Sequence, residues 1–195
     1  MKFKRIFLIF LSLFLSSNSF AQQFENKFDT KNHTKSKGVW LTVKYPTGWV
    51  ANEGERPNIV QMFSGKNDGK DYQLLLQIRD MGSDIEDECS KTNETQWNET
   101  FSNAATNTFA TNSKKIKVEG KTAFLSDMSI STQRLEYKFS FASKQMAVCH
   151  KKNLIILSCS NSLIGEKMPE AKANIEKVSG FCSQFFNTFV LAEKY

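Results

Sequence analysis

The strongest pattern in the chain is a period-two alternation of apolar and polar residues, which predicts β-strands. It begins in residues 39–49, which read VWLTVKYPTGW. One face of this stretch carries Val39, Leu41, Val43 and Tyr45. Because Pro46 and Gly48 follow with turn-forming backbone preferences, we expect a strand that ends in a tight turn. We take this stretch as the opening strand of the fold.

Two further strands are predicted at residues 58–64 and 72–79, joined by a glycine-punctuated hairpin loop. Together with the opening strand they are expected to form an antiparallel meander. Strand patterns return in the second half of the chain and end in a hairpin that turns at Lys151-Lys152. Residues 154–157, Leu-Ile-Ile-Leu, are apolar on both faces, which predicts a central strand covered on two sides. We therefore expect helices on opposite faces, or a sheet that folds over.

Two helices are predicted from apolar residues spaced three and four apart. The first covers residues 93–110, and its stripe consists of Trp97, Phe101, Ala104, Ala105 and Phe109. The second begins near Pro169, a residue favoured in a first helical turn. Its stripe consists of Ile175, Val178, Cys182, Phe185, Phe186 and Phe189. These elements predict an α+β fold in which an antiparallel sheet packs against two main helices.

The first 21 residues have the pattern of a secretory signal peptide. Three basic residues precede an apolar run at residues 6–15. Ser19-Phe20-Ala21 follows, with small residues at the positions that a signal peptidase recognises. A membrane anchor is the alternative, but the run is shorter than the roughly 20 residues that a spanning helix needs. We therefore expect cleavage after Ala21 and export of the remaining chain.

After cleavage we expect a flexible polar leader at residues 22–37 and a single domain over residues 38–195. Three of the 26 Lys and Arg residues lie in the signal, so 23 basic residues remain against 20 acidic ones, a net charge of about +3. This small charge gives no reason to expect a nucleic acid or a membrane surface as partner. The short, lysine-led signal favours a bacterium. A periplasmic or secreted protein without a stable membrane anchor is therefore predicted.

Four cysteines follow the signal: Cys89, Cys149, Cys159 and Cys182. An even count in an oxidising compartment predicts two disulfides. The cysteines form no CxxC pair, so a zinc site is not expected. A two-residue hairpin turn places Cys149 and Cys159 on opposite faces of the sheet. Because the closing helix would run back along the last strand, Cys182 is expected near the beginning of that strand. We therefore predict the bonds Cys149–Cys182 and Cys89–Cys159.

Residues 80–88 concentrate five carboxylates, those of Asp80, Asp84, Glu86, Asp87 and Glu88. Hard cations bind carboxylate oxygens, so these residues are candidate metal ligands. We favour a different interpretation, in which acidic residues complement the dipole of a following helix. Ser83 and Glu86 have the spacing of a capping box. The EF-hand pattern is absent, so neither a metal nor another cofactor is expected.

The sequence contains little that suggests catalysis. Its histidines are His33 and His150. Cys149 and His150 are adjacent, but neighbours on a strand point to opposite faces and cannot act as nucleophile and base. We expect His150 to be a surface residue at the end of a hairpin. Neither a phosphate-binding glycine loop nor a nucleophile elbow is present, so we do not expect an enzyme.

The order of elements across residues 38–191, with Tyr45-Pro46 and Gly48-Trp49 after the opening strand, resembles a known fold. It is the fold of the PsbP extrinsic protein of photosystem II and of Mog-type Ran-binding proteins. Periplasmic DcrB-like proteins and type VI secretion adaptor chaperones are similar. The resemblance implies a helix–sheet–helix sandwich used mainly for protein binding, and it carries no functional residue over to this chain.

We therefore predict an exported, non-enzymatic protein-binding module of the bacterial envelope. It would act as an immunity protein that neutralises a secreted toxin, or as an envelope accessory factor. The expected partner is another protein, and Trp40, Tyr45 and Trp49 are the candidate contact residues. Two alternatives remain open. One is a metal-dependent hydrolase that uses the carboxylates of residues 80–88, and the other is a carrier whose closing helix covers a small apolar ligand.

Overall fold

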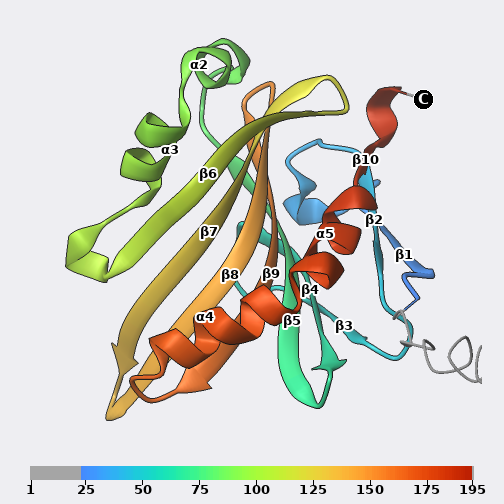
Figure 1. Ribbon diagram of the computed structural model, residues 1–195. Helices are drawn as coiled ribbons and strands as arrows, with labels where there is room; N and C mark the ends of the chain where they lie inside the picture. Colours follow the sequence, from blue (N-terminus) through green and yellow to red (C-terminus); the bar gives the residue numbers. More distant parts are fainter. Residues whose placement is uncertain (1–22, 195) are drawn as a thin grey trace, which may run out of the picture.

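The computed structural model describes residues 23–194 and is built around a seven-stranded antiparallel sheet (Figure 1). The predicted signal peptide, residues 1–21, lies outside the described residues. In spatial order the strands are β3 (Val50–Glu53), β4 (Ile59–Asn67), β5 (Lys70–Asp80), β9 (Asn153–Ile164), β8 (Tyr137–His150), β7 (Lys121–Arg134) and β6 (Thr108–Val118). Every neighbouring pair is antiparallel.

The central strand is β9, the fourth of the seven, and residues 154–157 are buried as predicted. Helices α2 (Glu86–Lys91) and α3 (Glu94–Phe101) pack on one face of the sheet. Helices α4 (Met168–Lys177) and α5 (Ser179–Asn187) pack on the other. The predicted α+β class and the placement of helices on both faces are confirmed.

The opening strand is β2 (Leu41–Tyr45), which lies in a separate three-stranded sheet. Its partners are β1 (Asn26–Asp29) and β10 (Val190–Leu191), whereas the strand beside β4 is β3. The prediction that the opening strand joins the meander is therefore wrong. Alternation of apolar and polar residues identifies a half-buried strand, but it does not identify the strand that pairs with it.

The segment at residues 22–37 is not the flexible leader that the composition predicts. From residue 23 onward it forms β1 and a single 3-10 turn. Phe28 packs against the main core, and the buried Thr30 hydroxyl accepts a hydrogen bond from the Leu41 N–H at 2.9 Å. The few apolar side chains of this polar segment are thus sufficient to dock it, and the folded domain begins before residue 38.

The helix predicted over residues 93–110 ends at Phe101, and the chain then turns into β6. The turn follows Asn103, whose side-chain oxygen accepts a hydrogen bond from the Ala105 N–H at 3.0 Å. Asparagine side chains offer the backbone such an alternative to helical bonds. Phe109 consequently lies on β6 and is 44% exposed, so the prediction that it belongs to the apolar stripe of a helix is wrong.

The closing segment forms two helices, α4 and α5, which meet at Val178. Pro169 lies in the first turn of α4, as predicted. All six residues of the predicted stripe are buried, with Cys182 and Phe185 fully inaccessible. The apolar periodicity is therefore right even though the segment is not one continuous helix.

Two disulfides are present, as predicted, but the predicted partners, Cys149 with Cys182 and Cys89 with Cys159, are wrong. The bonds join Cys89 to Cys149 and Cys159 to Cys182. Cys149 and Cys159 do lie on opposite faces of their hairpin. Because α5 covers the Cys159 face, the sheet separates Cys182 from Cys149. The face of the sheet on which each cysteine lies therefore determines the disulfide pairing, and the position along the strand does not.

The outer edge of β6 is covered by side chains of the α3 segment. The backbone N–H of Ala110 donates to Ser102 Oγ at 2.9 Å, and that of Lys115 donates to Glu94 Oε1 at 3.2 Å. The other edge strand, β3, has only four residues, and all four are exposed. Among the described helices, none combines the length and apolar character that crossing a membrane requires.

Candidate functional site

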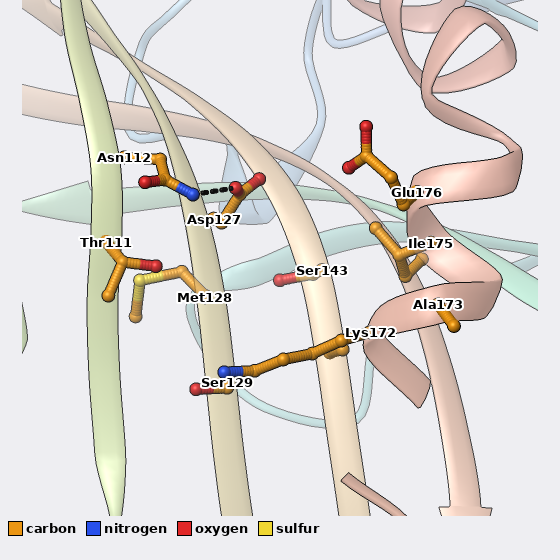
Figure 2. Close-up of a pocket in the computed structure, with 11 residues that line it drawn as sticks. Thr111, Asn112, Asp127, Met128, Ser129, Ser143, Lys172, Ala173, Ile175 and Glu176 are labelled. Carbon is orange, nitrogen blue, oxygen red and sulfur yellow. Dashed lines mark hydrogen bonds between the residues drawn. The ribbon is translucent and has the colours of Figure 1, made fainter. Parts of the chain in front are cut away.

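A hollow of about 340 Å³ lies between α4 and the strands β6, β7 and β8 (Figure 2). Its volume is at the lower end of the roughly 300–1,000 Å³ typical of small-molecule sites. Although the surface exposed to the hollow is mainly apolar, seven of the eleven lining residues are polar or charged: Thr111, Asn112, Asp127, Ser129, Ser143, Lys172 and Glu176. No residue of the Phe-rich helix α5 lines it, so it is not the pocket beneath that helix that the carrier alternative requires.

Beside the hollow, the ammonium of Lys144 on β8 lies between two carboxylates. Its Nζ is 3.1 Å from Asp127 Oδ1 on β7 and 3.0 Å from Glu176 Oε2 on α4. Burial disfavours the charged form of Lys144, but hydrogen bonds to Glu176 and Asp127 outweigh it and raise the pKa above its ordinary value. One ammonium thus faces two carboxylates, which leaves one negative charge uncompensated at this end.

The backbone fixes this cluster in place. Asp127 and Lys144 are directly opposed in the β7–β8 register, so their pairing follows from the strand alignment. A bulge interrupts β6 after Thr111, and Asn112 there has a φ of 55°. Asparagine tolerates this left-handed conformation better than most residues. The bulge turns its amide toward β7, where Nδ2 donates to Asp127 Oδ2 at 2.9 Å (Figure 2).

The opposite end of the hollow is cationic. Figure 2 shows the side chain of Lys172 extending from α4 across the hollow toward Ser129, away from Asp127 and Glu176. Within the described part of the chain, no carboxylate lies at ion-pair distance from the Lys172 ammonium. The hollow therefore has one end with excess negative charge and one end with a free positive charge.

A second feature is an apolar surface at the tip of the β7–β8 hairpin, formed by Leu135, Tyr137, Phe139 and Ile164. Leu135 is 92% exposed, Ile164 64% and Tyr137 52%. Phe139 is opposite Ile164 in the β8–β9 register, and Tyr137 lies two residues further out on the same face. Helices α2 and α3 cover the other end of the molecule (Figure 1). We call these four residues the hairpin-tip surface.

His150 is buried, so the prediction of a surface histidine is wrong. Its Nε2 lies 3.3 Å from Glu193 Oε2, and its Nδ1 lies 3.6 Å from Glu86 Oε1. Lys151 and Lys121 complete the cluster, at 2.7 Å from Glu193 and 2.7 Å from Glu86 respectively. The hairpin end is covered because the chain terminus, η3 (Ala192–Lys194), returns beside it. The ring nitrogens of His150 thus face carboxylates rather than a nucleophile.

Both carboxylates of this cluster have a lowered pKa. Burial raises the pKa of Glu86, but the Lys121 ammonium and the Lys151 backbone N–H lower it further than burial raises it. For Glu193, burial is likewise outweighed by hydrogen bonds from Lys151, the Trp40 backbone N–H and His150. The cluster therefore holds the terminal segment through ionised carboxylates.

The five carboxylates of residues 80–88 do not converge on one point. Their partners differ: Asp80 pairs with Lys152, Asp84 with the Glu86 backbone N–H, Glu86 with Lys121 and Asp87 with Lys91, while Glu88 is exposed. Within the described residues, no group of three or more His, Cys, Asp or Glu side chains is arranged to hold a metal ion. The predicted capping box at Ser83 is also wrong, because the N-cap residue of α2 is Ile85 and no side chain caps it; Asp84 Oδ1 accepts only the Glu86 backbone N–H just ahead.

The three predicted contact residues have different surroundings. Trp49 is buried against Phe181 at a ring distance of 5.4 Å, so it belongs to the core. Tyr45 is half-buried and stacks on Phe63 at 4.3 Å. Trp40 is half-buried near the surface, where Lys31 lies 4.5 Å from its ring centre. A role in partner binding therefore stays a prediction for Trp40 and Tyr45.

Sequence reasoning missed the residues of the hollow. A signal was present, because Asp127 and Lys144 occupy positions that face the core. Asp127 lies two residues after Leu125, and Lys144 lies between Ala142 and Met146. A charged residue at such a position requires a partner when it is buried. Pairing the two strands residue by residue would have brought these opposite charges together.

Comparison with known proteins places the chain among distant structural neighbours. No family model and no curated protein matches the sequence. The Ran-binding protein Mog1p of Saccharomyces cerevisiae aligns with a TM-score of 0.44 and 9% identity, over 77% of this chain and 89% of that one. A Pseudomonas aeruginosa protein of unknown function, PA94, aligns with a TM-score of 0.41 and 12% identity, over 73% and 88%. These are remote likenesses in structure alone.

Proposed function

We propose that this chain is an exported, non-enzymatic module that binds another protein through the hairpin-tip surface. The observation that carries the proposal is the clustering of exposed apolar side chains. Of six large hydrophobic residues exposed among the described residues, Leu135, Tyr137 and Ile164 lie together at this tip. Exposed apolar residues that gather in one place are typical of interaction sites, whereas scattered single residues are not.

The conformation of Leu135 supports the same conclusion. Its φ is 54°, in the left-handed region that costs a non-glycine residue about 1–2 kcal/mol. Glycine or asparagine would occupy this turn position more easily. A leucine here lowers stability and exposes its whole side chain to water. Strained, exposed apolar residues of this kind are better explained by contact with a partner than by folding.

The disulfides support an extracytoplasmic location. Two disulfides within one domain are typical of proteins from oxidising compartments such as the periplasm. Two roles suit an exported binding module of this kind, an immunity protein that neutralises a secreted toxin and an accessory factor of the envelope. They differ in the partner, which is a toxin in the first case and a resident envelope protein in the second.

The experiment compares capture of partners from envelope extract by the wild-type chain and by two variants. Leu135→Asn removes the most exposed apolar side chain and suits the turn, so it leaves the fold intact. Val50→Asn changes another exposed apolar residue, on β3 and away from the tip. We expect a partner that Val50→Asn retains and Leu135→Asn loses, and its identity separates the two roles. Equal capture by both variants would overturn the proposal.

The metal-dependent hydrolase is the competing function, and calorimetry tests it directly. Because four of the five acidic side chains of residues 80–88 are engaged with lysines or backbone N–H groups and the five do not converge, we expect no heat of binding with calcium, magnesium or zinc. Saturable binding that disappears in Glu88→Gln or Asp84→Asn would favour the hydrolase instead.

A further inference from the structure

We propose that the hollow between α4 and strands β6, β7 and β8 binds a small zwitterion, a molecule with one ammonium and one carboxylate such as an amino acid or a short peptide. The hollow is lined by none of the four residues of the hairpin-tip surface. This inference therefore does not depend on the proposed function. It rests on the arrangement of charge inside the hollow.

The anionic end is suited to an ammonium. Asp127 and Glu176 share the single ammonium of Lys144, at 3.1 Å and 3.0 Å. The Asn112 amide satisfies the second oxygen of Asp127 at 2.9 Å but adds no charge. The Glu176 side chain is 71% exposed and has one oxygen without a partner within the described chain. A ligand ammonium would compensate the remaining negative charge without displacing Lys144.

The cationic end is suited to a carboxylate. Lys172 reaches across the hollow with a free ammonium, and Ser129 lies beside it on β7 (Figure 2). Ser129 is largely buried, yet its hydroxyl has no hydrogen-bond partner within the described residues. Hydroxyl and ammonium donors together match the acceptor oxygens of a carboxylate.

The balance of charge excludes other simple ligands. A phosphate would gain Lys172 but would place two negative charges near the Asp127–Glu176 end. A divalent cation would have to compete with Lys144, whose pKa is raised and whose ammonium already occupies both carboxylates. An apolar molecule would contact the apolar part of the lining but would leave Lys172 and the Asp127–Glu176 end without a charged partner. A zwitterion alone among these classes satisfies both ends.

The probes are glycine, diglycine and triglycine, which present the same two charges at increasing separation. Two blocked analogues serve as controls: N-acetylglycine carries only the carboxylate, and glycinamide carries only the ammonium. Binding is followed through backbone amide shifts of the isotope-labelled mature chain. We expect at least one of the three zwitterions to shift amides that line the hollow, and to bind more tightly than either blocked analogue. The preferred length distinguishes a free amino acid from a peptide.

Two variants test the charges and a third controls for them. Lys172→Gln and Glu176→Gln each remove one end, and each is expected to weaken binding about two- to fivefold, as for exposed ion pairs. Lys177→Gln is the control for Lys172→Gln, since it removes a positive charge from the same helix but outside the hollow. It is expected to bind like wild type. Unchanged amide dispersion confirms that the variants are folded. No shift with any zwitterion, equal binding of the blocked analogues, or wild-type binding by Lys172→Gln would each overturn the proposal.

Discussion

The indole of Trp49 lies directly over Gly65, so closely that a Cβ at position 65 would come within 2.6 Å of three of its ring atoms. This contact joins the turn after the opening strand to β4 of the large sheet. Gly65 has an ordinary backbone conformation, so its lack of a side chain serves the close approach of the indole rather than a special turn.

Gly65→Ala is therefore expected to destabilise the protein. The added methyl group must displace a buried ring, and overpacking of this kind costs about 1–3 kcal/mol. Urea unfolding followed by tryptophan fluorescence measures the loss. The matched control is Gly180→Ala in α5, where a Cβ meets no atom within 4 Å. Alanine there should be neutral or stabilising by up to about 1 kcal/mol, since it favours the helix.

Removing either disulfide is expected to cost about 2–4 kcal/mol, because each bond restricts the unfolded chain. The two bonds differ in loop length, with separations of 60 residues for Cys89–Cys149 and 23 for Cys159–Cys182. Loop-closure entropy predicts that the paired alanine variant of the first bond loses about 0.8 kcal/mol more. Denaturant unfolding of the two double variants measures the difference. Peptide mapping without reduction checks the pairing itself, and a Cys149–Cys159 or Cys149–Cys182 peptide would contradict it.

Glu193→Gln is expected to destabilise the protein by about 1 kcal/mol at neutral pH, since it weakens hydrogen bonds to a charged group. The folded-state pKa of Glu193 is lowered, so its ionised form contributes stability above the ordinary value of 4.5. That contribution is lost as the pH falls through the lowered pKa. The difference between variant and wild type should therefore disappear in acid. Glu55→Gln, at an exposed position, provides the control, and a pH-independent difference for Glu193→Gln would contradict the electrostatic explanation.

Leu135→Asn is expected to raise stability even though it removes the centre of the hairpin-tip surface. Relief of the left-handed backbone strain should gain up to about 1 kcal/mol, since the leucine side chain makes no buried contact that would be lost. Thermal unfolding measures the gain. A loss of more than about 1 kcal/mol would mean that Leu135 has a structural role.

Local sequence patterns were sufficient for much of the fold. Residues 154–157 identify the central strand because apolar side chains on both faces require two covering layers. The spacing of Ile175, Cys182 and Phe185 identifies the buried side of the closing segment despite its break at Val178. These features depend only on residues close together in the chain, which is why a single sequence reveals them.

The features that were not predicted depend on distant contacts. His150 is buried by a chain terminus more than 40 residues away, at Glu193. The pairing of Cys182 depends on which face of the sheet α5 covers. The hollow requires β7, β8 and α4 to be aligned at once, so neither Asp127 nor Glu176 could be recognised as part of a site from its own neighbours.

The side chains that cover the β6 edge have a consequence for how the molecule associates with copies of itself. An uncovered edge strand offers its backbone groups to another chain, and repetition of that pairing produces fibres. Here Ser102 and Glu94 already occupy the outward N–H groups of Ala110 and Lys115. Continued stacking would need two open edges on every copy, and the edge opposite β6 is the short strand β3, with four residues. The α3 segment therefore opposes strand addition at Ala110 and Lys115 of β6 as well as forming a layer of the core.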